Sequence, residues 1–166
     1  MQITQRIAPC LWFDSQAEQA AAFYVSVFKN SRVVSVSRYS EVGREIHGRP
    51  PGSVMTVAFE LDGQSFTALN GGPIFKFNEA VSLQVYCDTQ KEIDYYWSVL
   101  SQGGDPSAQQ CGWLKDQFGL SWQVVPTVMN ELMKDHNSET AKRAMESFLR
   151  MKKIDIAELE RAAAVA

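Results

Sequence analysis

The sequence has few of the residues that form common metal and cofactor sites. It contains two histidines, His47 and His136, and three cysteines with no C-x-x-C pair. It has no G-x-G triplet, the glycine pattern of a nucleotide-binding turn between a strand and a helix. A structural zinc site, a disulfide framework and a doubly wound S-adenosylmethionine-binding fold are therefore not expected.

Long apolar runs and basic clusters are also missing. No run approaches the ~20 residues that span a bilayer, and the N-terminal segment lacks the basic start and apolar stretch of a signal peptide. The net charge is -3, and no basic cluster is longer than the pair Lys152 and Lys153. Phosphate binding requires a positive surface. We therefore expect a cytoplasmic, bacterial protein with no membrane and no nucleic-acid partner.

The composition is that of a folded globular chain. The 166 residues are 45% hydrophobic and 21% charged, which excludes a largely disordered or fibrous protein. This length corresponds to about one domain, since domains usually have ~100–200 residues. We predict a single domain over residues 1–166.

An internal repeat predicts the architecture. Residues 14–18 recur as residues 88–92, and each segment follows an apolar, strand-like run. Ser15 and Thr89 each precede a glutamate by three residues, which predicts a capping box at the start of a helix in both copies. The apolar residues that follow recur at helical spacing. A second match, between residues 63–67 and 119–123, places a strand at the end of each copy.

Each copy is thus predicted to form a strand, a helix and then three strands. Asp62 and Gly63 form a two-residue hairpin turn, in which Phe59 faces Phe66. After Pro126 the chain is predicted to be helical. The expected strands are 6–13, 32–40, 53–61 and 64–70 in module 1 (residues 5–72), and 81–87, 105–110, 111–116 and 120–125 in module 2 (residues 79–126). The expected C-terminal helices, within residues 127–163, are 127–135, 138–150 and 156–163.

Five motifs carry a resemblance that extends over most of the chain: residues 9–14, 68–73, 111–116, 119–126 and 151–156. With the duplicated unit, they resemble the vicinal oxygen chelate superfamily, which includes glyoxalase I, bleomycin-resistance proteins and extradiol dioxygenases. Within it they are most similar to the PhnB-like branch, often labelled 3-demethylubiquinone methyltransferase domain. The resemblance implies an α+β fold. In it, two tandem βαβββ modules form a U-shaped mixed sheet with a cavity, helices lie on the convex side, and a C-terminal helical extension follows.

The alternation of side chains along a strand then predicts which residues line that cavity. Apolar residues of one parity face the helices, and residues of the other parity face the cavity. We expect the ligand-binding lining to comprise Cys10, Trp12, Thr67, Leu69, Gln84, Tyr86, Trp113 and Gln123.

The same resemblance implies where a metal would be held. The superfamily's metalloenzymes place a His or Glu on each of four strands, and these positions correspond here to Ala8 or Pro9, Thr67, Ser82 and Gln123. Neutral hydroxyl and amide oxygens do not bind a catalytic transition metal tightly in competition with water. We therefore expect no metal and no cofactor.

Several of the lining residues have two interpretations. Trp12 and Trp113 could stack on a planar ligand or fill the core, whereas Trp122 has the parity of a core residue. Gln84 and Gln123 could orient a ligand carbonyl, or could bond to each other or to water.

Four other residues are expected to have structural roles. Cys10 is expected to be a buried thiol rather than a nucleophile. Lys115 and Asp116 are expected to form an exposed ion pair in a turn. Asn70 is expected to bond to the backbone at a strand end.

The sequence therefore predicts a metal-independent, homodimeric protein that binds a small organic molecule, and it identifies no catalytic residue. The alternative is an enzyme of the same superfamily, either lyase-, isomerase- or dioxygenase-like with a non-standard site, or 3-demethylubiquinone methyltransferase-like. A third interpretation is a collapsed cavity, with the dimer itself as the functional unit.

Overall fold

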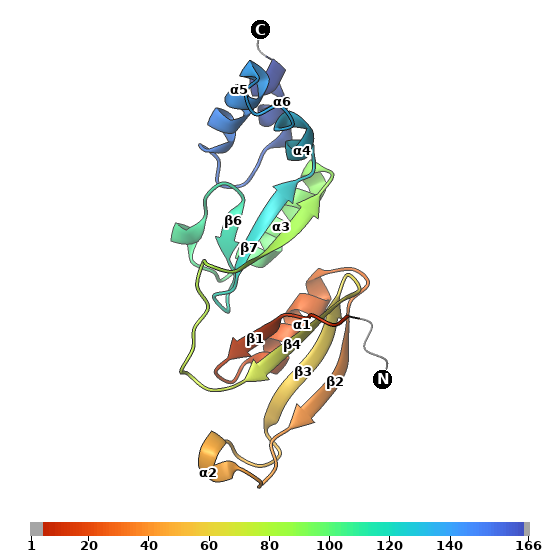
Figure 1. The fold of residues 1–166 in the computed structure, drawn as a ribbon, viewed down its shortest axis with the longest axis vertical. Coiled ribbons are helices and arrows are strands. Elements are labelled where there is room, and N and C mark those ends of the chain that lie inside the picture. The colour runs from red at the N-terminus through yellow and green to blue at the C-terminus, as the bar shows by residue number, and fades with distance from the viewer. Residues whose placement is uncertain (1–4, 165–166) are drawn as a thin grey trace. The chain divides into compact units, whose positions relative to one another are not determined.

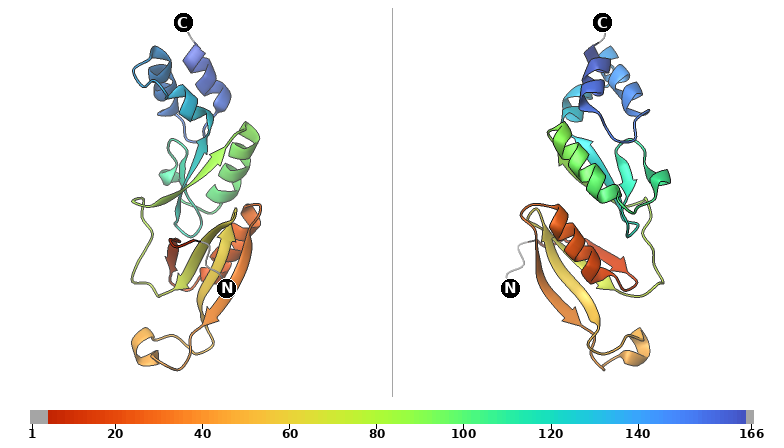
Figure 2. Two further views of the ribbon diagram at one scale, coloured as in Figure 1. Left: turned by 45° about the vertical axis from the view of Figure 1, so that its right-hand side comes forward. Right: turned by 180° about the vertical axis from the view of Figure 1, so that it is seen from behind.

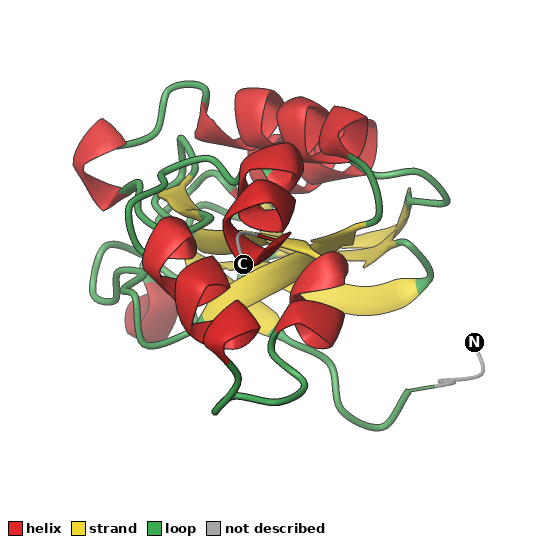
Figure 3. Cartoon of the chain, turned by 90° about the horizontal axis from the view of Figure 1, so that it is seen from above, coloured by secondary structure: helices red, strands yellow, loops and turns green. Residues whose placement is uncertain are grey.

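The computed structural model describes residues 5–164 and confirms the α+β class: the chain mixes helices with two small mixed sheets (Figure 3). It divides into two compact units that meet in sequence between Lys76 and Phe77. The combination of both sheets into one U-shaped sheet, and the single domain, stay predictions.

The first unit is a four-stranded sheet with one long helix (Figure 1). The strand order is β1-β4-β3-β2, with β1 parallel to β4 and the other pairs antiparallel. Helix α1 covers one face of this sheet (Figure 2). The elements are β1 (Cys10–Phe13), α1 (Ala17–Val27), β2 (Arg32–Arg38), α2 (Arg44–His47), β3 (Val54–Leu61) and β4 (Gln64–Asn70).

The hairpin between β3 and β4 has the predicted register. Phe59 pairs with Phe66, and their rings stack with centroids 5.5 Å apart. Asp62 and Gly63 both have positive φ angles, 46° and 77°. A two-residue turn of type I′, which matches the right-handed twist of the strands, requires positive φ at both positions. The buried face of the hairpin packs against α1, where the Tyr24 ring stacks on Phe59.

The N-terminus of α1 differs from the prediction. The Ser15 capping box is wrong: the helix starts after Gln16, and no side chain at that position caps it. Asn70, at the end of β4, provides the acceptor instead. Its Oδ1 accepts a hydrogen bond from the Ala17 amide at 2.8 Å, and its Nδ2 donates to the Val54 carbonyl at 3.1 Å. The predicted backbone role of Asn70 is confirmed, and it joins a helix to two strands.

Replacing Asn70 with alanine is expected to lower the free energy of unfolding by about 2–3 kcal/mol. The change leaves a buried amide and a buried carbonyl without their partners, and each costs about 1–3 kcal/mol. Urea unfolding followed by circular dichroism measures the loss. The control is Asn78→Ala, at an exposed loop position, which should stay within about 0.5 kcal/mol of the parent. Equal effects of the two substitutions would contradict the prediction.

The second unit is a three-stranded sheet with four α-helices in its described residues (Figure 1). The strand order is β5-β7-β6, with β5 parallel to β7 and β6 antiparallel to it. The elements are β5 (Ser82–Cys87), α3 (Gln90–Ser101), a 3-10 helix (Pro106–Ala108), β6 (Trp113–Lys115), β7 (Ser121–Pro126), α4 (Val128–Leu132), α5 (Glu139–Phe148) and α6 (Ile156–Ala164).

One predicted strand of this unit is wrong. Residues 105–110 contain the 3-10 helix instead, because Pro106 has no amide to donate and the Asp105 carboxylate accepts from the Ser107 amide at 2.8 Å. The strand predicted at 111–116 is shorter, since Cys111 and Gly112 have positive φ angles. The capping box of α3 at Thr89 is confirmed, as are the three C-terminal helices.

The segment between α5 and α6 is bonded to the rest of the second unit. The Cys111 and Gly112 amides donate to the carbonyls of Met151 and Lys152, both at 2.8 Å. The Gln90 side chain donates to the Ile154 carbonyl at 3.0 Å. Behind these bonds lies an apolar cluster of Met151, Ile154 and Leu159, packed against Met129, Leu132 and Phe148. The C-terminal helices therefore have a core of their own, fixed to the 110–112 turn.

Candidate ligand-binding site

The predicted lining residues of the first unit lie together on the face of its sheet opposite α1. Cys10 pairs with Thr67, and Trp12 pairs with Leu69. Cys10 is exposed and the other three are half-buried, whereas the residues between them on both strands are buried. Two neighbouring strands thus present a small patch with a thiol, a hydroxyl, an indole and an aliphatic side chain.

The Trp12 indole is held in one orientation. Its Nε1 donates to the Gly72 carbonyl at 2.8 Å, and the Phe75 ring meets it edge to face, with centroids 4.9 Å apart. A side chain at position 71 would collide with the ring, so Gly71 permits this close approach. Phe75 follows the last strand of the module, outside any periodic pattern, and was not predicted.

The second sheet presents a continuous hydrogen-bonded row of polar side chains, which we call the amide ladder: Tyr86, Gln84, Gln123 and Ser82. The Tyr86 hydroxyl donates to Gln84 Oε1 at 2.7 Å. The Gln84 amide donates to Gln123 Oε1 at 3.4 Å, and the Gln123 amide donates to the Ser82 hydroxyl at 2.8 Å. The two glutamines therefore bond to each other, as one of the two interpretations expected.

The amide ladder keeps hydrogen-bonding capacity for a ligand. Each glutamine amide has two N–H donors, and the ladder uses one of each. Gln84 and Tyr86 are exposed, Tyr86 at 58%. Trp113 pairs with Gln123 across β6 and β7, so its half-buried indole stands beside the ladder. This face can donate to acceptor oxygens and can stack on a planar group.

The turn after β6 corrects another prediction. Lys115 makes its ion pair with Glu79, in the segment before β5, and not with Asp116. Asp116 is buried, and its Oδ2 accepts from the Trp122 indole at 2.8 Å. Trp122 is 2% exposed, on the helix side of the sheet as its parity predicted. Lys115 is two residues from Trp113 on the same strand, so the two side chains point to the same face of the sheet. This alternation could have predicted that the Lys115 side chain lies on the face of the amide ladder.

The residues at the superfamily's metal positions do not fit a tightly held transition metal. In the second unit these are Ser82 and Gln123, whose hydroxyl and amide bond to each other. In the first unit, Thr67 provides a neutral hydroxyl, and Ala8 and Pro9 provide no side-chain donor. A carboxylate, imidazole or thiolate is the usual ligand for such an ion. Over residues 5–164, no three His, Cys, Asp or Glu side chains are arranged to hold a metal ion.

The three cysteines differ in exposure. Cys10 is exposed, which corrects the prediction of a buried thiol, although its partial burial raises its pKa. Cys87 is fully buried beneath α3. Its desolvation, aided by the negative charges of Glu92 and Asp88, raises the pKa of the Cys87 thiol to about 12.

Cys87 is therefore expected to resist alkylation in the folded protein. At pH 8, iodoacetamide should label Cys10 and leave Cys87 unmodified until the chain is unfolded, as read by peptide mass spectrometry. The raised pKa also means that the unfolded state loses this proton first. Stability should therefore fall as the pH rises from about 9 toward 12, and Cys87→Ala should remove that part of the fall. Native labelling of Cys87 at the rate of Cys10 would contradict this.

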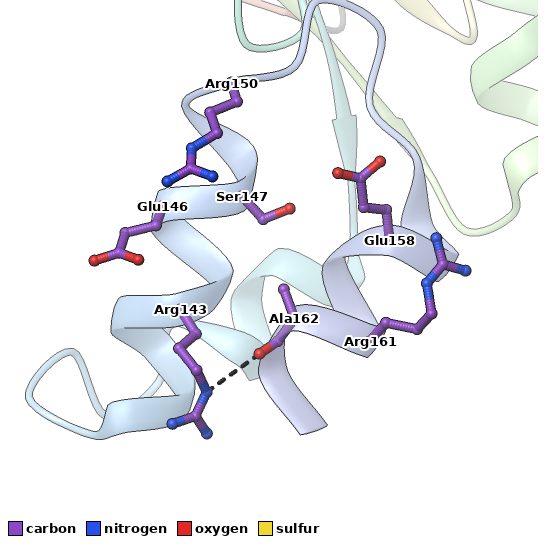
Figure 4. A pocket seen from close by; sticks show the side chains of 7 residues that line it. All are labelled: Arg143, Glu146, Ser147, Arg150, Glu158, Arg161 and Ala162. Carbon is purple, nitrogen blue, oxygen red and sulfur yellow. Dashed lines mark hydrogen bonds between the residues drawn. The ribbon is translucent and has the colours of Figure 1, made fainter. Parts of the chain in front are cut away.

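A separate shallow pocket of about 380 Å³ lies between α5 and α6 (Figure 4). Three arginines line it, Arg143, Arg150 and Arg161, together with Glu146 and Glu158. Figure 4 shows the three guanidinium groups pointing to separate places around the pocket. Arg143 bonds the carbonyls at the end of α6. These side chains do not converge on one ligand, and we assign no binding role to this pocket.

The βαβββ order of the first unit, followed by a second mixed sheet with a helix on one face, matches the fold of the vicinal oxygen chelate superfamily. The family model described as 3-demethylubiquinone-9 3-methyltransferase matches residues 5–125. The chain belongs to this family, whose members are PhnB-like. Among curated proteins, none matches the chain.

Solved structures agree with this assignment. A Bacillus cereus PhnB protein, described as a 3-demethylubiquinone-9 3-methyltransferase, is 37% identical, with a TM-score of 0.62; the match covers 74% of this chain and 100% of that one. A Pseudomonas aeruginosa protein is 17% identical over 74% and 98% of the two chains, with a TM-score of 0.55. The fosfomycin resistance protein FosX from Listeria monocytogenes, solved with Mn(II) and sulfate, is 12% identical over 82% and 100%, with a TM-score of 0.53. The last two likenesses concern the fold alone.

Proposed function

We propose that this protein binds a small organic molecule on the amide-ladder face of its second sheet, without a metal ion. The observation that carries the proposal is the ladder itself. Four polar side chains on two adjacent strands are bonded in sequence, with an indole beside them. Ligand sites commonly combine an apolar or aromatic surface with a few polar groups in fixed positions.

The chemistry of the donors supports binding without metal. Ser82 and Gln123 stand where metalloenzymes of the superfamily have charged or imidazole ligands, and here they satisfy each other. Amide N–H groups and hydroxyls recognise acceptor oxygens, such as carbonyl or carboxylate oxygens, through hydrogen bonds. The ladder therefore favours recognition of an oxygen-bearing ligand over Lewis-acid activation of it.

We further propose that the protein is a homodimer in the bacterial cytoplasm. The strands β1 and β5 lie at the edges of their sheets, and open edges favour pairing with another chain. The three cysteines are free thiols, which is consistent with a reducing compartment. No helix within residues 5–164 is long and apolar enough to cross a bilayer. Sedimentation equilibrium should give twice the chain mass of 18.6 kDa; a single chain mass would reject the dimer.

The binding proposal is tested on the purified protein. We expect native mass spectrometry to find a retained small organic molecule, and elemental analysis to find far less than one transition-metal ion per chain. Gln123→Ala removes the centre of the ladder and should weaken retention at least tenfold, because it deletes the amide N–H that the ladder leaves for a ligand and the two bonds that hold Gln84 and Ser82 in place. The matched control is Gln64→Ala, an exposed glutamine in the first unit, which should retain the molecule.

A thermal-shift series separates this proposal from the enzyme alternatives. Zinc, nickel, manganese and S-adenosylmethionine are each added at high concentration. A ligand present at a hundred times its dissociation constant adds about 2.7 kcal/mol of apparent stability. No shift is expected with any of them. The proposal would be overturned if one metal ion bound per chain and the Gln123→Ala variant failed to bind it. Stabilisation by S-adenosylmethionine would also overturn it.

A further inference from the structure

A second row of side chains crosses the same face of the second sheet. Ser82 on β5 pairs with Ser121 on β7, and Ser121 pairs with Lys115 on β6. Paired residues on neighbouring strands point to the same side of a sheet. Since Ser82 bonds to Gln123, the whole row lies on the amide-ladder face. It adds an ammonium group and a second hydroxyl to the amides of the ladder.

Ser121 in this row is a buried donor with an unused hydroxyl. The residue is 1% exposed, and its Oγ has no hydrogen-bond partner among the described residues. Leaving a buried hydroxyl unsatisfied costs about 1–3 kcal/mol, so alanine at this position would suit the fold better. A buried hydroxyl without a partner, on the residue that pairs with Lys115 across the strands, is the arrangement expected where a ligand oxygen completes the site.

Lys115 already holds a carboxylate. Its ammonium pairs with Glu79, whose side chain is 63% exposed, while that of Lys115 is 23% exposed. A hydrogen bond from Lys115, followed by a backbone hydrogen bond, lowers the pKa of the Glu79 carboxyl. Exposed ion pairs contribute only about 0–1 kcal/mol. Another carboxylate can therefore replace Glu79 on Lys115 at little cost.

We propose that Lys115 and Ser121 bind the carboxylate of a planar organic acid, with its ring against Trp113, and that Glu79 pairs with the Lys115 ammonium when the acid is absent. This inference rests on the proposed function, because it identifies the class of ligand for the same face. One carboxylate oxygen accepts from the ammonium, and the other accepts from the hydroxyl one strand away. The ladder amides then meet further oxygens of the ligand.

The test compares two probes of the same size and shape, a carboxylate and its neutral amide, in which an NH₂ group replaces one carboxylate oxygen. Benzoate and benzamide are titrated into the full-length protein by isothermal titration calorimetry at pH 7. We expect benzoate to bind at least tenfold more tightly than benzamide. Lys115→Met should abolish this preference, and Glu79→Gln should tighten benzoate binding because it removes the competing carboxylate. The matched control is Lys153→Met, which breaks another ion pair of this unit, with Asp94, and should leave the preference intact.

Ser121→Ala distinguishes a ligand contact from a structural role. It should weaken benzoate binding severalfold while leaving the melting temperature unchanged or higher, since the lost hydroxyl has no partner in the fold. A structural serine would show the reverse, a lower melting temperature with unchanged affinity, and that result would overturn the assignment of Ser121.

The outcomes also separate this inference from the proposed function. Equal binding of the two probes, or binding of benzamide alone, rejects the carboxylate position but agrees with an uncharged ligand on the ladder. Absence of benzoate binding likewise rejects the inference. The proposed function is then judged by the retained molecule and the Gln123→Ala variant, which do not depend on ligand charge.

Discussion

Replacing Asp116 with alanine is expected to lower the free energy of unfolding by about 4 kcal/mol. Its Oδ1 accepts from the amides of Phe118 and Leu120 at 2.8 and 3.1 Å, and its Oδ2 accepts from the Trp122 indole. Hydrogen bonds to a charged group contribute about 1.5–3 kcal/mol each. Asp116 is 2% exposed, so water cannot fully replace the lost acceptors. The turn that connects β6 to β7 would lose its organising group.

Two further variants make the Asp116 prediction specific. Asp116→Asn keeps an oxygen for the two amides but directs an NH₂ group at the indole N–H, so it should cost about half as much. Asp105→Ala removes an exposed aspartate that also accepts a backbone amide, and it should cost about 1 kcal/mol or less. Urea unfolding followed by tryptophan fluorescence gives all three values. An Asp116→Ala loss no larger than that of Asp105→Ala would contradict the prediction.

The local and periodic features of the fold could be predicted from the sequence. The β3–β4 register follows from a two-residue turn and a period-two pattern, so Phe59 was correctly paired with Phe66. The Thr89 capping box was also correct, because all of its atoms lie within one helical turn. The Ser15 capping box was wrong because Asn70, which is 53 residues from the Ala17 amide, supplies the acceptor. A single sequence gives no sign that a residue so far along the chain caps the helix.

The candidate site shows the same limit. Parity placed Gln84, Gln123 and Tyr86 on one face, and the structure shows that they lie there. The partner of Lys115 was mistaken because its neighbour in sequence, Asp116, is an obvious ion-pair partner. In a strand, however, adjacent residues point to opposite faces, so a charge at the next position is poorly placed for a salt bridge. The unpartnered hydroxyl of Ser121 depends on packing, which no pattern of residue types reveals.

Deleting residues 127–166 is expected to destabilise the second unit by about 4 kcal/mol or more. The 37% identical Bacillus cereus protein is matched over its whole length by 74% of this chain, so a relative exists that is shorter than this protein. The deletion removes the acceptors of the Cys111 and Gly112 amides and the Gln90 contact, each about 1 kcal/mol. It also removes the burial of Ile154 against the 110–112 turn, about 1.5–3 kcal/mol more. Domains have only about 5–15 kcal/mol of total stability, so this loss is a large fraction of the total, and the shortened chain should unfold at a markedly lower temperature than the full chain.

A matched pair of point variants tests whether this anchoring, and not merely chain length, is responsible. Ile154→Asp places a charge in a fully buried position, and the second unit should then lose its cooperative transition. Ile46→Asp makes the same change at a residue that is 86% exposed, and it should leave the melting temperature within about two degrees. Hydrogen exchange provides the local readout: the Cys111 and Gly112 amides should be protected in the parent chain and lose protection in both the deletion and Ile154→Asp. If these amides keep their protection when residues 127–166 are absent, the turn has another acceptor, and the C-terminal helices are not what holds it.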